Sequence, residues 1–311
     1  KMVQYLVILL DDTAVSFCHN ENERTERRLI PLETLRQGIL YGMTENLNIQ
    51  FVYPDYELPK EYLEAIDTID HTDIRPVSVS RDADVVVSES ADIACVDRKT
   101  AYVLRLSKAE LFAKTDSVCA LIKQVDRLNI VITDIETFTE ADFKAYEACL
   151  GKLALTVEDE YVNGNAPQLN LLTDRIMLDK MNNCGAGDTN ITLAPDGKFY
   201  VCPAFYQSAG GYAVGSLAEG LDIKNPQLYK LDHAPLCRIC EALQCRRCVW
   251  LNRKTTLEVN TPSHEQCVVA HLERNASREL LANIRKHGAF MPEKEIKKID
   301  YLDPFDVRKE W

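Results

Sequence analysis

The sequence CRICEALQCRRC, residues 237–248, contains two CxxC pairs separated by four residues. Of the eleven cysteines in the chain, seven lie between Cys184 and Cys267. Tight CxxC pairs with further cysteines at longer range are typical of a chain that surrounds a tetrahedral metal ion or an iron–sulfur cluster. The preceding stretch NITLAPDGKFYVC, residues 190–202, predicts two short apolar strands joined by a Pro-Asp-Gly turn. The region therefore predicts a metal centre beside a β-hairpin, and the number of cysteines favours two centres.

The composition is that of an ordinary globular protein. Apolar residues make up 46% of the 311 residues, so the chain can bury a large core, and its length favours two domains. The net charge of −12 argues against broad nucleic-acid binding, because that function needs a basic face. An acidic surface would suit a basic partner or peptide, but it is also common among soluble proteins.

The cysteine content and the first strand bear on the cellular compartment. The apolar run Val3–Leu10 is too short for a transmembrane helix, and no basic segment or small-residue cleavage site marks a signal peptide. We therefore expect a cytoplasmic protein with no membrane partner. In that compartment, cysteines are metal ligands or reduced core thiols more often than disulfides.

Strand-like and helix-like segments alternate through the first half of the chain. Ser107 with Glu110, and Thr139 with Asp142, have the spacing of helix-capping boxes. This alternation indicates a parallel sheet with crossover helices. The segments expected to form strands are 3–10, 47–53, 77–79, 84–88, part of 94–106 and 128–133, and helices are expected from Pro31, over 60–66, from Ser107 and from Thr139.

No conventional active-site motif occurs in this half. A GxGxxG fingerprint, a P-loop and a nucleophile elbow are all missing from the sequence. The isolated His71 and His233 are expected to be surface or capping residues.

After Cys267, residues 268–272 and 277–287 are expected to be helical, with Ser277 as an N-cap and Gly288 just past the helix end. His264 and His271 flank Cys267, but the cysteines already suffice as ligands. The charged tail, 292–311, would lie along its own domain or dock on a partner chain.

The cysteine order resembles that of the SPASM domain, the auxiliary iron–sulfur module of many radical-SAM peptide and sulfatase maturases. Gly197-x4-Cys202, the word Val201-Cys202-Pro203-Ala204-Phe205 and the later Val214-Gly215-Ser216-Leu217 carry the likeness beside the cysteines. The group from Cys237 to Cys248 departs from the family, with x4 and x2 spacings in place of x5 and x3.

The resemblance implies two [4Fe–4S] clusters, each held by cysteines of this region. One cluster would have only three cysteines, so its fourth iron would be open or bound by Asp188. The alternative is two structural zinc sites, or one zinc site and reduced thiols. The implied ligands are Cys184, Cys202 and Cys248 for the first cluster, and Cys237, Cys240, Cys245 and Cys267 for the second.

The first half resembles a radical-SAM domain that lacks its cluster motif. That family carries CxxxCxxC after its first strand, and Asp11, Val15 and Cys18 occupy the three positions here. The glycine-rich motif that the family carries after its second strand is replaced here by YPDYE, residues 53–57. Because one thiolate cannot hold a [4Fe–4S] cluster, the resemblance implies that the chain neither binds nor cleaves SAM.

The combination is most similar to the CXXX repeat peptide maturases. It implies an α/β fold: a partial (β/α) barrel of the radical-SAM type over 1–165, a SPASM domain with a β-hairpin and helices over 166–275, and a helix with a charged tail over 276–311.

The implied function is an auxiliary iron–sulfur subunit of a ribosomal-peptide maturation system. It would bind a Cys-rich precursor peptide, relay electrons for a partner radical-SAM enzyme, or do both. The alternatives are a zinc-stapled peptide-binding protein and a stand-alone maturase that uses the open iron beside Cys248.

Overall fold

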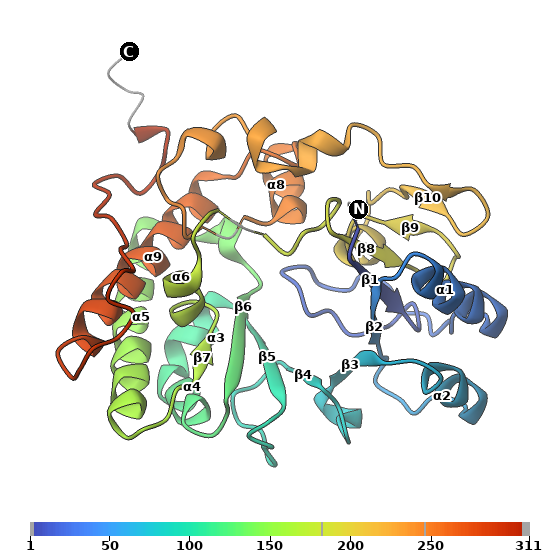
Figure 1. Cartoon of the computed structure of the whole chain (residues 1–311), viewed down its shortest axis with the longest axis horizontal. Helices are drawn as coiled ribbons and strands as arrows, with labels where there is room; N and C mark the ends of the chain where they lie inside the picture. Colours follow the sequence, from blue (N-terminus) through green and yellow to red (C-terminus); the bar gives the residue numbers. More distant parts are fainter. Residues whose placement is uncertain (1–2, 182, 246, 307–311) are drawn as a thin grey trace. The chain divides into compact units, whose positions relative to one another are not determined.

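The computed structural model describes residues 3–181, 183–245 and 247–306. It is a mixed α/β protein with a nine-stranded, mostly parallel sheet (Figure 1), which confirms the expected class. A separate two-stranded ribbon pairs β10 (Gly215–Ser216) with β11 (Gly220–Leu221). The strands of the sheet are β1 (Tyr5–Leu9), β2 (Asn48–Val52), β3 (His71–Pro76), β4 (Val85–Ser88), β5 (Ala101–Leu106), β6 (Arg127–Ile132), β7 (Gln168–Leu169), β8 (Asn190–Leu193) and β9 (Phe199–Tyr200).

The helices vary from single turns to more than five turns. No helix of the described residues combines the length and apolar character that crossing a membrane requires. The α-helices are α1 (Leu32–Thr44), α2 (Lys60–Ile66), α3 (Lys108–Ala113), α4 (Thr115–Ile122), α5 (Glu140–Val162), α6 (Thr173–Met177), α7 (Ala204–Gln207), α8 (Val249–Thr256) and α9 (His264–Ile284), and 3₁₀ turns cover Val77–Val79, Ile135–Thr137, Pro226–Tyr229, Leu231–His233 and Cys237–Ile239.

The chain folds into two compact units, and each is built from two separate segments. The first unit combines the segment up to residue 87 with 184–230, and the second combines 88–183 with the segment from 231 onward. These units divide the chain differently from the three expected domains, 1–165, 166–275 and 276–311, which remain a prediction.

The first unit is organised around β1. This strand pairs in parallel with β2 on one side and with β8 on the other, and Leu6 and Ile8 are fully buried. A strand buried in this way reads as a continuous apolar run, which is how the sequence revealed it. Helix α1 packs close to the sheet because Gly38 lacks a side chain: a Cβ there would lie 2.4 Å from Leu193.

The predicted hairpin of the first unit is confirmed. β8 and β9 are antiparallel, with Thr192 opposite Tyr200. Gly197 adopts a φ of +75° in the connecting turn, a conformation that other residues rarely adopt.

The second unit packs helices against the parallel strands β5, β6 and β7. Both predicted capping boxes are present, at Ser107 for α3 and at Thr139 for α5. The two longest helices, α5 and α9, run side by side (Figure 1). Tyr146 of α5 donates a hydrogen bond of 2.8 Å to Glu273 of α9 within this buried interface.

Three local predictions were wrong. Val77–Val79 is a 3₁₀ turn, because Pro76 ends β3 and Val77 faces solvent, so β-branching alone does not make a strand. The helix expected from Ser107 is two helices, α3 and α4, that meet at Lys114. Ser277 lies inside α9, where its hydroxyl donates to the carbonyls of Leu172 and Glu273, and Ser263 is the N-cap instead.

Candidate metal centre

Three cysteines of the second unit, Cys237, Cys240 and Cys245, share one cluster of packed side chains, and Cys267 is close enough for their thiols to affect its own. These four cysteines are here called the cysteine core. Cys237 opens a 3₁₀ turn that ends at Cys240, Cys245 follows in the next loop, and Cys267 lies in the first turn of α9. Met181, Ala234, Ala242 and Ile299 pack around the first three thiols. These four cysteines are the ligand set expected for the second cluster.

The thiols are close enough to influence one another. Burial raises the pKa of Cys267 well above its usual value, and the neighbouring Cys245, Cys237 and Cys240 raise it further. Burial also raises the pKa of Cys245 to about 12, with Arg175 acting in the opposite direction. Without a metal, Cys245 and Cys267 are therefore neutral thiols, and binding a metal would release their protons.

The described residues contain no three His, Cys, Asp or Glu side chains already placed to hold a metal ion. The fit to a metal is one of chemistry and burial: four soft sulfur donors in one shielded core suit zinc or an iron–sulfur cluster. The assignment of Cys237, Cys240, Cys245 and Cys267 as ligands accordingly stays a prediction.

Three arginines are buried in the same unit beside the cysteine core. Arg175 donates to the carbonyl of Gln244 at 2.7 Å and forms an ion pair with Glu273. Arg274 donates to the side-chain oxygen of Gln244 at 2.9 Å and to the carbonyl of Lys297. Arg247 acts on Cys237 through a hydrogen bond and through its charge, and both lower the pKa of that thiol against the larger effect of burial.

The histidines near Cys267 have partners of their own. The Nδ1 atom of His271 lies 2.7 Å from the carbonyl oxygen of Cys267, which leaves Nε2 3.8 Å from the sulfur of Cys240. Burial lowers the pKa of His271. His264 lies 2.7 Å from the buried carboxylate of Asp303. Only His271 therefore has a contact with a thiol of the cysteine core, and the expectation that neither histidine is a ligand stays a prediction.

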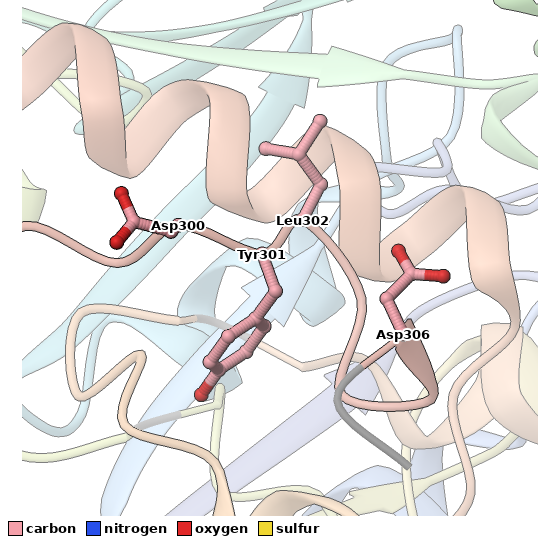
Figure 2. A pocket seen from close by; sticks show the side chains of 4 residues that line it. All are labelled: Asp300, Tyr301, Leu302 and Asp306. Atoms are coloured by element: carbon pink, nitrogen blue, oxygen red, sulfur yellow. The ribbon is translucent and has the colours of Figure 1, made fainter. Parts of the chain in front are cut away.

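A surface pocket lies over the cysteine core on the segment after Ile299. Its volume is about 520 Å³, and Figure 2 shows its lining: Asp300, Tyr301, Leu302 and Asp306. The hydroxyl of Tyr301 accepts a hydrogen bond of 3.0 Å from the backbone of Glu241 and lies 3.7 Å from the sulfur of Cys240. Tyr301 therefore connects this pocket to the cysteine core.

The cysteines of the other expected set fall in different units. Cys184 is exposed and Cys202 is buried in the first unit, whereas Cys248 is the N-cap of α8 in the second. Asp188, the suggested fourth ligand, has Lys230 3.9 Å from its carboxylate. No unit by itself brings this set together, so a cluster at Cys184, Cys202 and Cys248 remains a prediction.

The loop that follows β1, residues 11–28, is held by side chains of the first unit. Asp12 is buried and accepts hydrogen bonds from Tyr206 and Arg28, and its ion pair with Arg28 measures 2.9 Å. Gln207 donates to the carbonyl of Ala14 at 2.9 Å. Arg24 lies 3.6 Å from the ring centre of Tyr206. Tyr206 and Gln207 of helix α7, which follows the β-hairpin in the chain, thus hold this loop in place.

The residues at the expected cluster-motif positions belong to this loop. Asp11 accepts hydrogen bonds from the backbone and hydroxyl of Thr13 and, at 2.8 Å, from the hydroxyl of Tyr56 in the YPDYE word. Cys18 is half-buried. The two segments whose sequences differ from the radical-SAM pattern, residues 11–18 and 53–57, therefore contact each other through the hydrogen bond between Tyr56 and Asp11.

Among solved structures, this fold is similar to that of anSMEcpe, whose structures contain bound AdoMet and, in one case, a peptide. The tagged form of anSMEcpe with bound AdoMet has a TM-score of 0.63 at 13% identity, over 91% of this chain and 99% of that chain. The chain shares the fold of anSMEcpe. Native anSMEcpe with bound AdoMet and Cp18Cys peptide has a TM-score of 0.60 at 13% identity, with the same coverage. The expected α/β fold with a mostly parallel sheet is confirmed.

Streptococcus suis SuiB bound to S-adenosylmethionine has a TM-score of 0.47 at 12% identity, over 85% of this chain and 77% of that chain. The chain matches no protein-family model and no curated protein sequence.

Sequence reasoning did not find the arginines beside the cysteine core. Only one signal was available: Arg274 stands seven residues after Cys267, the spacing that places two residues on one face of a helix. Arg175 is 69 and 98 residues away in sequence from its partners Gln244 and Glu273, so no local pattern indicates its burial.

Proposed function

We propose that the chain is an auxiliary iron–sulfur protein of a peptide-maturation system, working with a separate radical-SAM enzyme. The observation that carries the proposal is the cysteine core, which brings four thiols near one another in a chain whose fold resembles that of anSMEcpe. In this reading Cys237, Cys240, Cys245 and Cys267 hold one [4Fe–4S] cluster, and Cys184, Cys202 and Cys248 contribute to a second.

A bound cluster would supply a one-electron carrier for the partner's reaction. The chain itself would hold the sulfur ligands and shield them from water, since Cys237, Cys240 and Cys267 are buried. The partner peptide is proposed by analogy with anSMEcpe, which is recorded with a bound Cp18Cys peptide.

The proposal assigns no SAM cleavage to this chain. Asp11 and Val15 stand where thiolates are needed, and Asp11 is occupied by hydrogen bonds with Thr13 and Tyr56. The radical would therefore be generated on the partner enzyme.

The test is anaerobic purification followed by iron, sulfide and zinc analysis and EPR of the reduced protein. We expect about four iron and four sulfide for each cluster. Cys245→Ser should remove the iron of one cluster, whereas Cys119→Ser, which alters a half-buried thiol outside the set, should leave the iron content unchanged. Co-purification with a co-expressed radical-SAM peptide maturase tests the subunit role.

A zinc-stapled peptide-binding protein is the second candidate. The observation that favours it is that the cysteine core offers four sulfurs, the number that closes a structural zinc site. A colourless protein that retains zinc and shows no EPR signal would support this candidate and contradict an electron-carrying role.

A further inference from the structure

The hydroxyl of Tyr301 is held in a position to donate a hydrogen bond to the sulfur of Cys240. The backbone N–H of Glu241 donates to the phenol oxygen at 3.0 Å. The hydroxyl in turn donates its single proton toward the sulfur of Cys240, which lies 3.7 Å away. Within the part of the chain that the structure describes, this hydroxyl has no third partner. The amide of Glu241 therefore leaves the phenol proton directed at the sulfur.

Packing holds the ring of Tyr301 in this position. Ile299, two residues earlier, belongs to the same buried cluster of side chains as Cys240, and Tyr301 packs against that cluster. The ring centres of Tyr301 and His271 are 5.6 Å apart, with the planes tilted by 53°. Removing the hydroxyl while keeping the ring would therefore leave these contacts in place, so the hydrogen bond and the packing can be tested separately.

The segment that carries Tyr301 is attached to α9 on both sides of this residue. Before it, Arg274 of α9 donates to the backbone carbonyl of Lys297. After it, the carboxylate of Asp303 lies 2.7 Å from Nδ1 of His264, the first residue of α9. Since α9 also supplies one cysteine of the cysteine core, Tyr301 is anchored to an element that would itself hold the metal.

The sulfur of Cys240 has a second hydrogen-bond donor, the backbone N–H of Ala242 at 3.4 Å. Hydrogen bonds to a metal-bound sulfur stabilise the negative charge on it. They therefore favour the reduced state of a redox centre, which carries more negative charge, and they raise its reduction potential. A donor placed as the Tyr301 hydroxyl is would tune a metal held by Cys240 without binding it.

We propose that Tyr301 is a positioning residue of the metal centre, whose hydroxyl donates a hydrogen bond to the sulfur of Cys240 and so sets the electronic properties of the bound metal. This role rests on the proposed metal site and goes beyond it, because Tyr301 is not a ligand. Tyr301 also lines the surface pocket together with Asp300, Leu302 and Asp306 (Figure 2). The C-terminal segment thus connects the molecular surface to the centre through a single hydroxyl.

The decisive variant is Tyr301→Phe in the full chain, which keeps the ring and removes the hydroxyl. With iron bound, we expect its reduction potential, measured by redox titration followed by EPR, to be more negative than that of the wild type, because the reduced centre loses a hydrogen bond. A second probe is Co²⁺, which reports on the sulfur ligands without requiring an iron–sulfur cluster. The sulfur-to-cobalt charge-transfer absorption of the variant should shift to longer wavelength, because the sulfur electrons are less stabilised.

Tyr102→Phe is the matched control. Tyr102 is buried in the same unit, and its hydroxyl also accepts a hydrogen bond from a backbone amide, that of Asp97 at 2.9 Å. Both variants therefore lose an acceptor for an amide, whereas only Tyr301→Phe loses a donor to sulfur. We expect Tyr102→Phe to leave the potential and the cobalt absorption unchanged. If Tyr301→Phe shifts neither quantity, or if Tyr102→Phe shifts both equally, the hydroxyl of Tyr301 has only a structural role and the proposal is wrong.

The two probes also separate the role of Tyr301 from the proposed function. A wild type that binds zinc and Co²⁺ but no iron removes the electron-carrying role, while the cobalt spectra of the two variants still decide the role of Tyr301. A wild type that binds iron, with the same reduction potential in Tyr301→Phe, overturns only the role of Tyr301. A chain that binds none of these metals overturns both.

Discussion

The loop after β1 and the cysteine core differ in how their charges are balanced. In the loop, Asp11 and Asp12 are satisfied by the chain itself, through Thr13, Tyr56 and Arg28 among others. In the cysteine core, burial raises the pKa of Cys245 and Cys267, and their thiols lie close to those of Cys237 and Cys240. The charges of the loop are paired by its own side chains, whereas the cysteine core gathers sulfur atoms of the kind that bind zinc or iron.

This difference indicates where a cofactor belongs. Soft sulfur donors gathered in one core suit a bound metal, whereas a network whose charges are already paired needs no ligand. We therefore locate the proposed metal site in the cysteine core, while the loop connects β1 with α1 and is held by α7.

The largest effect should come from removing the metal. Anaerobic chelation should lower the melting temperature and destabilise the folded state by about 4 kcal/mol, if free metal had been present at roughly 1,000 times its dissociation constant. Hydrogen exchange of Asp12 and Ala14, whose amides bond within the loop to Arg28 and Asp11, should not change. Faster exchange at those amides on chelation would contradict the independence of the loop.

Asp12→Ala should remove the interactions that hold the loop in place and leave the metal content of the protein unchanged. It deprives Arg28 and Tyr206 of their shared acceptor, so we expect the free energy of unfolding to fall by about 2 kcal/mol, measured by urea denaturation. The control is Asp55→Ala, which removes an exposed ion pair with Arg27 and should cost less than about 1 kcal/mol. Loss of iron from the Asp12 variant would show that the two regions depend on each other.

Two matched hydroxyl deletions compare the regions directly. Tyr56→Phe removes a donor to the carboxylate of Asp11 and should cost about 2 kcal/mol, because hydrogen bonds to charged groups are the stronger kind. Tyr301→Phe removes an acceptor from the Glu241 amide and should cost about 1 kcal/mol. Equal costs, measured by chemical denaturation of both metal-loaded variants, would argue against the charged network in the loop.

The smallest effect concerns alkaline pH. Burial and the hydrogen bond to Asp12 raise the pKa of Tyr206, so the folded state holds the phenol proton more tightly than the unfolded chain does. This contribution to stability is fully present below pH about 10, where the unfolded phenol ionises, and declines as the pH rises further. In Tyr206→Phe, the free energy of unfolding should therefore fall less steeply between pH 9 and 11 than in the metal-loaded wild type. An unchanged slope would remove Tyr206 from the network.

The sequence predicted those features that depend on local patterns. Apolar runs located β1 and β2, capping boxes located α3 and α5, and the Pro-Asp-Gly turn located the hairpin of β8 and β9. The strand β3 was missed because its sequence, HTDIRP, mixes charged and apolar residues, and its pairing with β2 and β4 overrides that composition.

The candidate site was predicted only in part, for a related reason. Cysteine spacing identifies possible ligands, because ligands recur close together along the chain. Their surroundings come from distant segments: Arg175 reaches the core from α6, and Arg274 from α9. An arginine in a sequence is expected to be exposed, so nothing marked these as buried.

The position of β1 between β2 and β8 limits how this protein can be divided. A fragment ending at residue 165 would keep β1 and β2 but lose β8, and the freed edge of β1 would carry unpaired backbone groups beside fully buried side chains. Exposed edges of that kind pair with other chains and aggregate. A fragment beginning at residue 166 would hold β8 without the strand against which it forms. For expression and for complementation experiments, the chain must be treated as indivisible at that point.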